Sequence, residues 1–217
     1  MIDTGKIRAI IFDLDGVLLS TDTYHYMAWK ELADELGIPF CEKDNEAFRG
    51  VSRMDCMEIL VSKSDTLQLT EEEKVAFATK KNERYRSFLE NITPDFVEGE
   101  VREVLRVLRE RGYRLAVGSS SKNSKFILEK TDLTDCFDAI VDGNDISRSK
   151  PDPEVFLKAA QALCADPAQC AVIEDAEAGL QAAVGGGMLP IAMGEARGSS
   201  LASLSLESLY DLVKIFA

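Results

Sequence analysis

The sequence predicts an α/β protein: a doubly wound, Rossmann-like parallel sheet core with an inserted all-helical cap domain. Three observations lead to this prediction. Short apolar strands alternate with helical segments from about residue 93 onward, which is typical of a parallel sheet with right-handed crossovers. A further apolar run opens the chain and ends in aspartates, and the segment between these two regions has no strand pattern. We therefore assign residues 1–18 and 93–217 to the core and 19–92 to the cap.

The first strand of the prediction is the apolar run at residues 9–12, which is suited to burial on both faces of a sheet. Asp13 and Asp15 follow it at once, with Gly16 next. Carboxylates are costly to bury, so acids at a strand end indicate a purpose for that charge. Alternation along a strand would place Asp13 and Asp15 on one face.

Helical spacing dominates the predicted cap. Its runs cover about residues 25–36, 53–60 and 71–89. Thr70 with Glu73 has the pattern of a capping box, and Ser52 with Asp55 gives a similar signal at the start of the second run. We expect hinges near residues 19 and 93.

The remaining core elements follow in regular order. Asp152 and Pro153 are expected as N-cap and first residue of one of these helices. The expected elements are a helix over 101–108, a strand over 115–117, a helix around 126–128, a strand over 137–141, a helix from 153 to about 163, a strand over 171–173, a helix over 176–184, a strand over 189–193 and a helix over 206–216.

Composition excludes some classes of function. A net charge of −13 argues against nucleic acid or an anionic membrane as partner. The five cysteines form no CxxC pair, which favours reduced thiols and a cytoplasmic protein. Residues 1–6 are polar and give no sign of a signal peptide. Nothing in the sequence demands more than a monomer.

Four of the predicted strand ends carry polar side chains. They contribute Asp13 with Asp15, the stretch 119–123, Ser149 with Lys150, and Glu174 with Asp175. Ligands of doubly wound sheets bind beyond the carboxyl ends of the strands. Four acids in one crevice require a cation, and hard oxygen ligands favour Mg²⁺.

In these motifs the chain resembles the haloacid dehalogenase-like phosphotransferases, and among them the sugar-phosphate mutases, over essentially its whole length. The matching core motifs are Asp13-Leu14-Asp15-Gly16-Val17, Ser119 before Lys122-Asn123, Ser149-Lys150-Pro151-Asp152-Pro153, and Glu174-Asp175 with Gly179. Cap residues also match, among them Thr21, His25 and Arg53.

The resemblance implies the following roles in the core. Asp13 is the nucleophile that is phosphorylated, and Asp15 is the general acid and base. Lys150 neutralises the nucleophile, and Ser119 with nearby amides cradles the transferred phosphate. The implied cofactor is Mg²⁺, held by Asp13, Asp15 (through its main-chain oxygen), Glu174 and Asp175.

The resemblance also implies a set of substrate-binding residues. Arg53 would grip the phosphate that does not react, because a guanidinium binds phosphate bidentately. Taken alone, Arg53 could be a solvated residue at a helix start, and His25 could simply pack or face water. The complete set is Thr21, His25, Trp29, Arg49, Gly50, Val51, Ser52, Arg53, Lys81, Asn82, Ser120, Ser121, Lys122 and Asn123.

The resulting prediction is a Mg²⁺-dependent mutase that interconverts β-D-glucose 1-phosphate and glucose 6-phosphate through an aspartyl-phosphate and a sugar bisphosphate. The expected partner is a small sugar phosphate. A sugar-phosphate phosphatase is the alternative, since it would share every core residue and differ only in letting water attack the phosphorylated aspartate. A phosphosugar-binding protein without activity is disfavoured by the intact core motifs.

Overall fold

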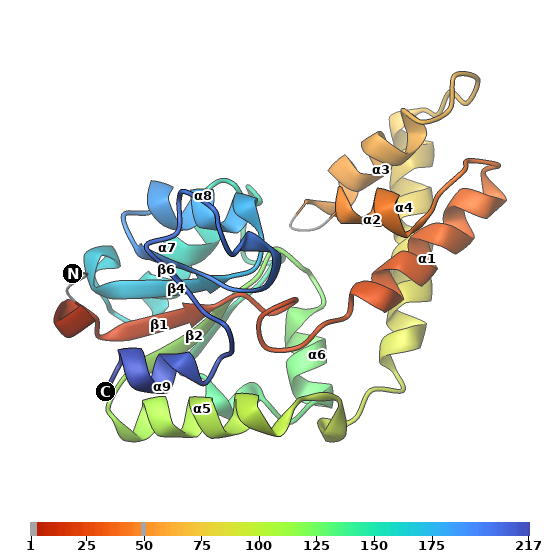
Figure 1. The fold of residues 1–217 in the computed structure, drawn as a ribbon. Coiled ribbons are helices and arrows are strands. Elements are labelled where there is room, and N and C mark those ends of the chain that lie inside the picture. Colours follow the sequence, from red (N-terminus) through yellow and green to blue (C-terminus); the bar gives the residue numbers. More distant parts are fainter. Residues whose placement is uncertain (1–3, 49–50) are drawn as a thin grey trace. The chain divides into compact units, whose positions relative to one another are not determined.

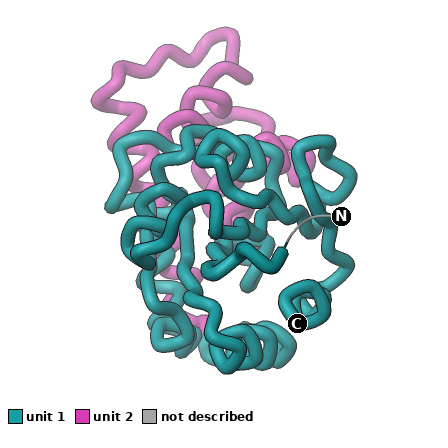
Figure 2. The backbone as a smooth tube through the Cα atoms, turned by 90° about the vertical axis from the view of Figure 1, so that its left-hand side faces the viewer, with its two compact units in different colours: residues 1–20, 93–217 teal, residues 21–92 magenta. Residues whose placement is uncertain are grey.

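The computed structural model describes residues 4–48 and 51–217, which form two compact units (Figure 2). The core unit comprises residues 1–20 and 93–217, and the cap unit comprises residues 21–92. The chain leaves the core once and returns to it once.

A six-stranded parallel sheet forms the centre of the core unit. Its strand order is β3-β2-β1-β4-β5-β6, so β1 lies between the second and fourth strands of the chain. This arrangement confirms the predicted fold class. The strands are β1 (Ala9–Phe12), β2 (Arg114–Gly118), β3 (Ala139–Val141), β4 (Cys170–Glu174), β5 (Leu189–Ala192) and β6 (Leu204–Ser205).

Helices cover both faces of this sheet (Figure 1). Ala9 and Ile11 of β1 pack in one cluster with residues of α7 and α8, while α5 lies beside α9 on the other face. Within the described part of the chain, no helix has the length and apolar character needed to cross a membrane. The core helices are α5 (Gly99–Glu110), α6 (Ser124–Lys130), α7 (Glu154–Ala162), α8 (Glu177–Gly185) and α9 (Asp211–Ile215).

The cap unit is built from helices with an apolar centre of their own. Thr70 and Glu73 form the predicted capping box at the start of the longest helix, and Ser52 accepts a hydrogen bond from the Asp55 amide at the start of another. Trp29, Leu32 and Met57 are among the residues at this centre. The helices are α1 (Asp22–Glu35), α2 (Glu42–Glu46), α3 (Arg53–Val61) and α4 (Glu71–Leu89).

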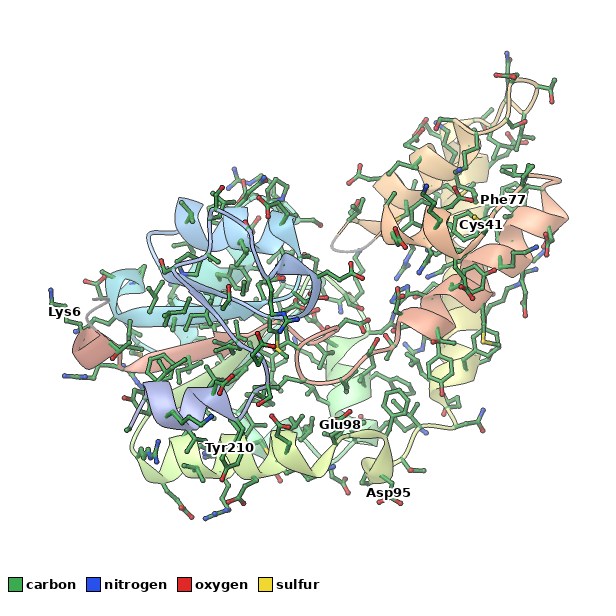
Figure 3. The ribbon with its side chains drawn as sticks, viewed as in Figure 1. Lys6, Cys41, Phe77, Asp95, Glu98 and Tyr210 are labelled. Atoms are coloured by element: carbon green, nitrogen blue, oxygen red, sulfur yellow. The ribbon has the colours of Figure 1, made fainter. Side chains whose placement is uncertain are left out.

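Two local expectations are wrong. The segment 206–216 is not one helix: β6 precedes it and only α9 is helical, because Leu206, Leu209 and Leu212 are buried from a turn followed by a short helix. The amide of Tyr210, which is labelled in Figure 3 just before α9, donates to a carboxylate oxygen of Glu100 in α5 at 2.8 Å. The N-cap of α7 is Pro153, one residue later than expected, although the carboxylate of Asp152 still accepts from the amide of Glu154 in the first turn at 3.0 Å.

Candidate active site

Asp13 continues the line of β1 beyond its last residue. Its amide donates to the carbonyl of Ile173 at 3.0 Å, and its side chain is buried. The strand ends at Phe12, so the strand alternation from which we expected Asp13 and Asp15 to share one face does not extend to Asp15. A turn carries Asp15 instead: the amide of Gly16 donates to the carbonyl of Leu19 at 2.7 Å.

Lys150 joins two acids that lie far apart in the sequence. Its Nζ lies 2.5 Å from Oδ1 of Asp13 and 2.5 Å from Oε1 of Glu174. The lysine side chain is only 2% exposed, and its Nζ lies 4.6 Å from the ring centroid of Phe156. The sequence predicted that Asp13 and Lys150 share a crevice, and they are in direct contact.

Burial and neighbouring charges act in opposite directions on Lys150 and Asp13. Burial alone would lower the pKa of Lys150, but the carboxylates of Asp13 and Glu174 outweigh it and raise that pKa. Burial raises the pKa of Asp13, and Glu174 adds to the rise, while Lys150 opposes it. Lys150 therefore remains a cation and offsets only part of the negative charge around it.

Glu174, the last residue of β4, is fixed at both carboxylate oxygens. Oε1 accepts from Lys150, and Oε2 accepts from the amide of Ala176 at 2.9 Å. A Cβ at Gly179 would lie 1.9 Å from Oε1 of Glu174. The glycine of this motif therefore provides the space in which the glutamate lies.

Asp175 lies against the first loop of the core. A Cβ at Gly16 would lie 1.9 Å from Oδ2 of Asp175, and Gly16 has φ +79°, where a side chain is strained. The pKa of Asp175 is raised to about 8 by burial first, and then by Asp13, Glu174 and Asp15, with Lys150 opposing. The acids of the predicted metal set are thus close enough to repel one another.

This donor set fits a divalent cation in its chemistry. Several carboxylates repel one another beside a single lysine, and hard oxygen donors suit Mg²⁺. The set is not closed around one point, however: across residues 4–48 and 51–217, no three His, Cys, Asp or Glu side chains are grouped closely enough to hold a metal by themselves. Main-chain oxygen, water or substrate would have to complete the coordination.

The loop after β2 brings hydroxyl groups to the same end of the sheet. Ser119 is buried, its amide donates to the carbonyl of Val141, and its Oγ accepts from the amide of Ser121 at 3.2 Å. The Oγ of Ser120 is buried and has no hydrogen-bond partner. The loop thus carries Ser119, Ser121 and the exposed Lys122, the residues that we expect to bind phosphate.

A second loop, residues 142–145, is hydrogen-bonded to the loop of residues 119–123. The amide of Gly143 donates to the carbonyl of Ser121 at 3.1 Å, and the side-chain amide of Asn144 donates to the carbonyl of Lys122 at 3.0 Å. A Cβ at Gly143 would lie 2.3 Å from the carbonyl oxygen of Ser120. The loop 142–145 was not singled out from the sequence, and only its Asp-Gly-Asn turn signal could have indicated it.

Within the cap unit, His25 and Lys81 are in contact. The Nζ of Lys81 lies 2.8 Å from Nδ1 of His25, and it lies 4.8 Å from the ring centroids of both Trp29 and Tyr85. Burial lowers the pKa of His25 well below its usual value, and the charges of Lys81 and Arg53 lower it further. The imidazole is therefore neutral beside a cationic lysine.

Arg53 and Asn82 form a second pair in the cap. Arg53 is the first residue of α3, and its Nη2 donates to Oδ1 of Asn82 at 2.8 Å. Burial lowers the pKa of Arg53, which stays far above neutral pH in any protein. Ser52 uses its hydroxyl to cap α3, and Val51 packs against the apolar centre of the cap.

Four predicted residues remain: Thr21, Asn123, Arg49 and Gly50. Asn123 is buried as the N-cap of α6, and its amide donates to Oγ of Ser121 at 3.2 Å. Thr21 is fully buried, and its Oγ1 shares a hydrogen bond of 2.8 Å with the hydroxyl of Tyr85. Arg49 and Gly50 lie outside the residues that the structure describes. Tyr85 was missed by sequence reasoning, although its position four residues after Lys81 places both on one face of α4.

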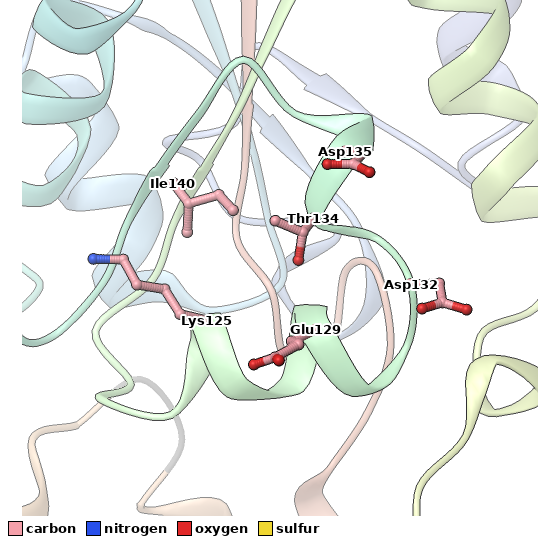
Figure 4. Close-up of a pocket in the computed structure, with 6 residues that line it drawn as sticks. All are labelled: Lys125, Glu129, Asp132, Thr134, Asp135 and Ile140. Atoms are coloured by element: carbon pink, nitrogen blue, oxygen red, sulfur yellow. The ribbon is translucent and has the colours of Figure 1, made fainter.

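A separate pocket lies beside α6 and does not coincide with these residues (Figure 4). It has a volume of about 670 Å³ and contains none of the motif residues. Its lining residues are Lys125, Glu129, Asp132, Thr134, Asp135 and Ile140.

The sheet order, the Asp13–Lys150–Glu174 contact and the helical insertion together define a class. Residues 7–187 match the family model of the haloacid dehalogenase-like hydrolases, and the chain belongs to that family. The resemblance drawn from the sequence is thereby confirmed.

Among named relatives, the chain is similar to a β-phosphoglucomutase of Bacillus subtilis (strain 168). The two are 37% identical over 207 residues, which cover 95% of this chain and 92% of the relative. A fructose-1-phosphate phosphatase of Escherichia coli (strain K12) is 30% identical and is matched over 84% of this chain and 94% of its own length. A crystal structure of β-phosphoglucomutase from Clostridium difficile superposes with a TM-score of 0.87 at 35% identity, covering 95% of this chain and 93% of the other.

Proposed function

We propose that this chain is a Mg²⁺-dependent phosphosugar mutase that converts β-D-glucose 1-phosphate into glucose 6-phosphate by way of β-glucose 1,6-bisphosphate. The contact of Lys150 with Asp13 and Glu174 is the observation that carries the proposal. A buried carboxylate beside a lysine, at the end of a central parallel strand, is suited to attack on phosphorus. The likeness to a named mutase over 95% of the chain supports the choice of reaction.

The proposed chemistry has two phosphoryl transfers. The phosphorylated form of Asp13 gives its phosphoryl group to the 6-hydroxyl of the 1-phosphate, while Asp15 accepts the hydroxyl proton. The bisphosphate then reorients within the site. Asp13 attacks the phosphorus at C1, the bond from phosphorus to the C1 oxygen breaks, and Asp15 returns the proton to that oxygen. Proton transfer of this kind is worth about 10²–10⁴ in rate.

Each transfer moves negative charge between Asp13 and the sugar oxygens. Lys150, which is in contact with Asp13, would neutralise charge on the carboxylate and on the phosphoryl oxygens. Mg²⁺, which we assign to Asp13, Asp15, Glu174 and Asp175, would supply further charge stabilisation at the phosphoryl group when bound. Ser119 and the amides of its loop would hold the remaining phosphoryl oxygens.

A mutase must also hold the phosphate that is not reacting. Within the cap unit, we assign this role to Arg53. The bond from Arg53 to Asn82 orients the guanidinium while leaving further N–H donors for a phosphate.

The decisive experiment follows phosphorus by ³¹P NMR. Purified protein is mixed with Mg²⁺, β-glucose 1-phosphate and a trace of bisphosphate, and we expect glucose 6-phosphate without free phosphate. Asp13→Asn should abolish turnover, and the phosphoryl group should be found on residue 13 of the native protein. Phosphate on another residue, or turnover in Asp13→Asn, would contradict the assignment.

A sugar-phosphate phosphatase is the second candidate. Relatives named as phosphatases support it, at 28% and 30% identity. The same core residues would serve, with water in place of the sugar hydroxyl. Release of inorganic phosphate faster than isomerisation in the same NMR experiment would favour this candidate.

A further inference from the structure

Tyr85 of α4 lies at the meeting point of three residues to which we assign a part in substrate binding. Its side chain is only 1% exposed. Its hydroxyl shares a buried hydrogen bond of 2.8 Å with Oγ1 of Thr21, at the start of the cap unit. Its ring centroid lies 4.0 Å from that of His25, with the rings tilted by 32°, and 4.8 Å from Nζ of Lys81.

The contact between His25 and Lys81 has a defined hydrogen-bond direction, and the ring of Tyr85 lies against both residues. An ammonium group has donors only, so Nδ1 of His25 accepts and its proton lies on Nε2. The same ammonium group makes cation–π contacts with the ring faces of Tyr85 and Trp29. Arg53 is the other cation whose charge acts on His25, and it also keeps the imidazole neutral.

We propose that Tyr85 is a positioning residue: its ring holds the imidazole of His25 and the ammonium group of Lys81 in their present geometry, and its hydroxyl ties both to Thr21. The proposal rests on the proposed function in one respect, since it assumes that His25 and Lys81 act on the sugar phosphate. The two parts of the tyrosine have separate tasks, which separate substitutions can test.

The ring is tested without any turnover, because His25 is the only histidine of the chain. Two-bond ¹H–¹⁵N NMR of the ¹⁵N-labelled protein at neutral pH should show one neutral imidazole with the proton on Nε2. In Tyr85→Leu we expect a mixture of tautomers and a higher pKa for His25. Tyr26→Leu, in the same unit with its ring stacked on Phe40, is the matched control and should leave the His25 signals unchanged.

The hydroxyl is tested by a double-mutant cycle on kcat/KM. Tyr85→Phe and Thr21→Val each remove one end of the hydrogen bond, and each should lower kcat/KM by about 3–10-fold. The double variant should lose no more than either single one. Losses that multiply would overturn the link between the hydroxyl groups, and this arm remains available if Tyr85→Leu does not fold.

A purely structural role gives a different set of results. Tyr85→Leu would then lower the melting temperature while the tautomer and pKa of His25 stay as in the native protein, and the positioning role would be wrong. If the native protein lacks mutase activity but Tyr85→Leu changes the His25 signals, the proposed function fails and the positioning of His25 by Tyr85 stands.

Discussion

The carboxyl group of Glu174 fills the space that a side chain at position 179 would take. The two residues lie on successive elements, β4 and α8, and a Cβ on Gly179 would approach Oε1 of Glu174 to 1.9 Å. The same oxygen accepts a hydrogen bond from Lys150, which also contacts Asp13. A side chain at position 179 would therefore disturb the contact between Glu174, Lys150 and Asp13.

Gly179→Ala should therefore disturb both stability and activity. We expect a loss of about 1–3 kcal/mol in the free energy of unfolding, as for overpacked cores, together with lower kcat. Urea unfolding and the mutase assay measure the two effects. Gly99→Ala is the matched control, since a Cβ there meets nothing within 4 Å at the start of α5. Equal behaviour of the two variants would contradict the close packing at Glu174.

Removing the charge of Lys150 should be costly at neutral pH. In Lys150→Met the carboxylates of Asp13 and Glu174 stay buried without their cation, and breaking a buried pair costs about 3–5 kcal/mol. Urea denaturation at neutral pH tests this. Lys30→Met breaks an exposed ion pair with Asp34 and should change stability little. A Lys150→Met protein as stable as the native one would show that the two acids are not held as charges.

Mg²⁺ should stabilise the protein more at higher pH. The folded pKa of Asp175, about 8, exceeds its ordinary value of 3.8. Its protonated form thus contributes stability that is complete below about 3.8 and is lost as the pH rises through about 8. A bound cation takes the place of that proton and restores the loss.

Thermal unfolding with and without Mg²⁺ from pH 5 to 9 measures this effect. A ligand at 100 times its Kd adds about 2.7 kcal/mol. NaCl at matched ionic strength is the control, and Asp175→Asn should flatten the pH dependence. Stabilisation by Mg²⁺ that is independent of pH, or unaffected by Asp175→Asn, would contradict the assignment.

Arg53→Ala should weaken binding of the sugar bisphosphate by about 2–5 kcal/mol, the usual loss when one member of a buried charge pair is removed. Arg53→Lys keeps the charge but loses the bidentate geometry, so an intermediate loss is expected. Isothermal titration with β-glucose 1,6-bisphosphate measures both. Arg106→Ala, whose partners Glu103 and Glu110 are on the surface of α5, serves as the control. An unchanged Kd in Arg53→Ala would contradict the assignment of Arg53 as the residue that binds the non-reacting phosphate.

Local signals predicted some elements closely and others poorly. Helix α4 begins and ends at the expected residues because the capping box at Thr70 and Glu73 defines its start. The C-terminal segment misled the prediction, since leucines spaced by three residues fit a helix and a turn alike. Strand β1 spans the expected residues 9–12, but the backbone turns at Leu14 to form the loop that holds Gly16, so strand alternation does not extend to Asp15.

The sequence predicted which residues form the candidate site, but it did not predict the contacts between their side chains. The motif spacing indicated that Asp13, Lys150 and Glu174 meet, yet no local pattern reveals that Lys150 bridges the two acids across 137 and 24 residues of chain. The Arg53–Asn82 bond joins two helices and depends on how α3 packs against α4. Such contacts follow from tertiary packing, which single-sequence periodicity does not describe.

The close approach of Gly143 to the carbonyl of Ser120 has a consequence for changing the specificity of this enzyme class. The loops 119–123 and 142–145 are joined by a bond from the Gly143 amide to the Ser121 carbonyl and by one from the Asn144 side chain to the Lys122 carbonyl, and a methyl group at position 143 would force them apart. An exchange of either loop alone for that of a relative would leave mismatched backbones in contact. The two segments should be transplanted together, as a single cassette.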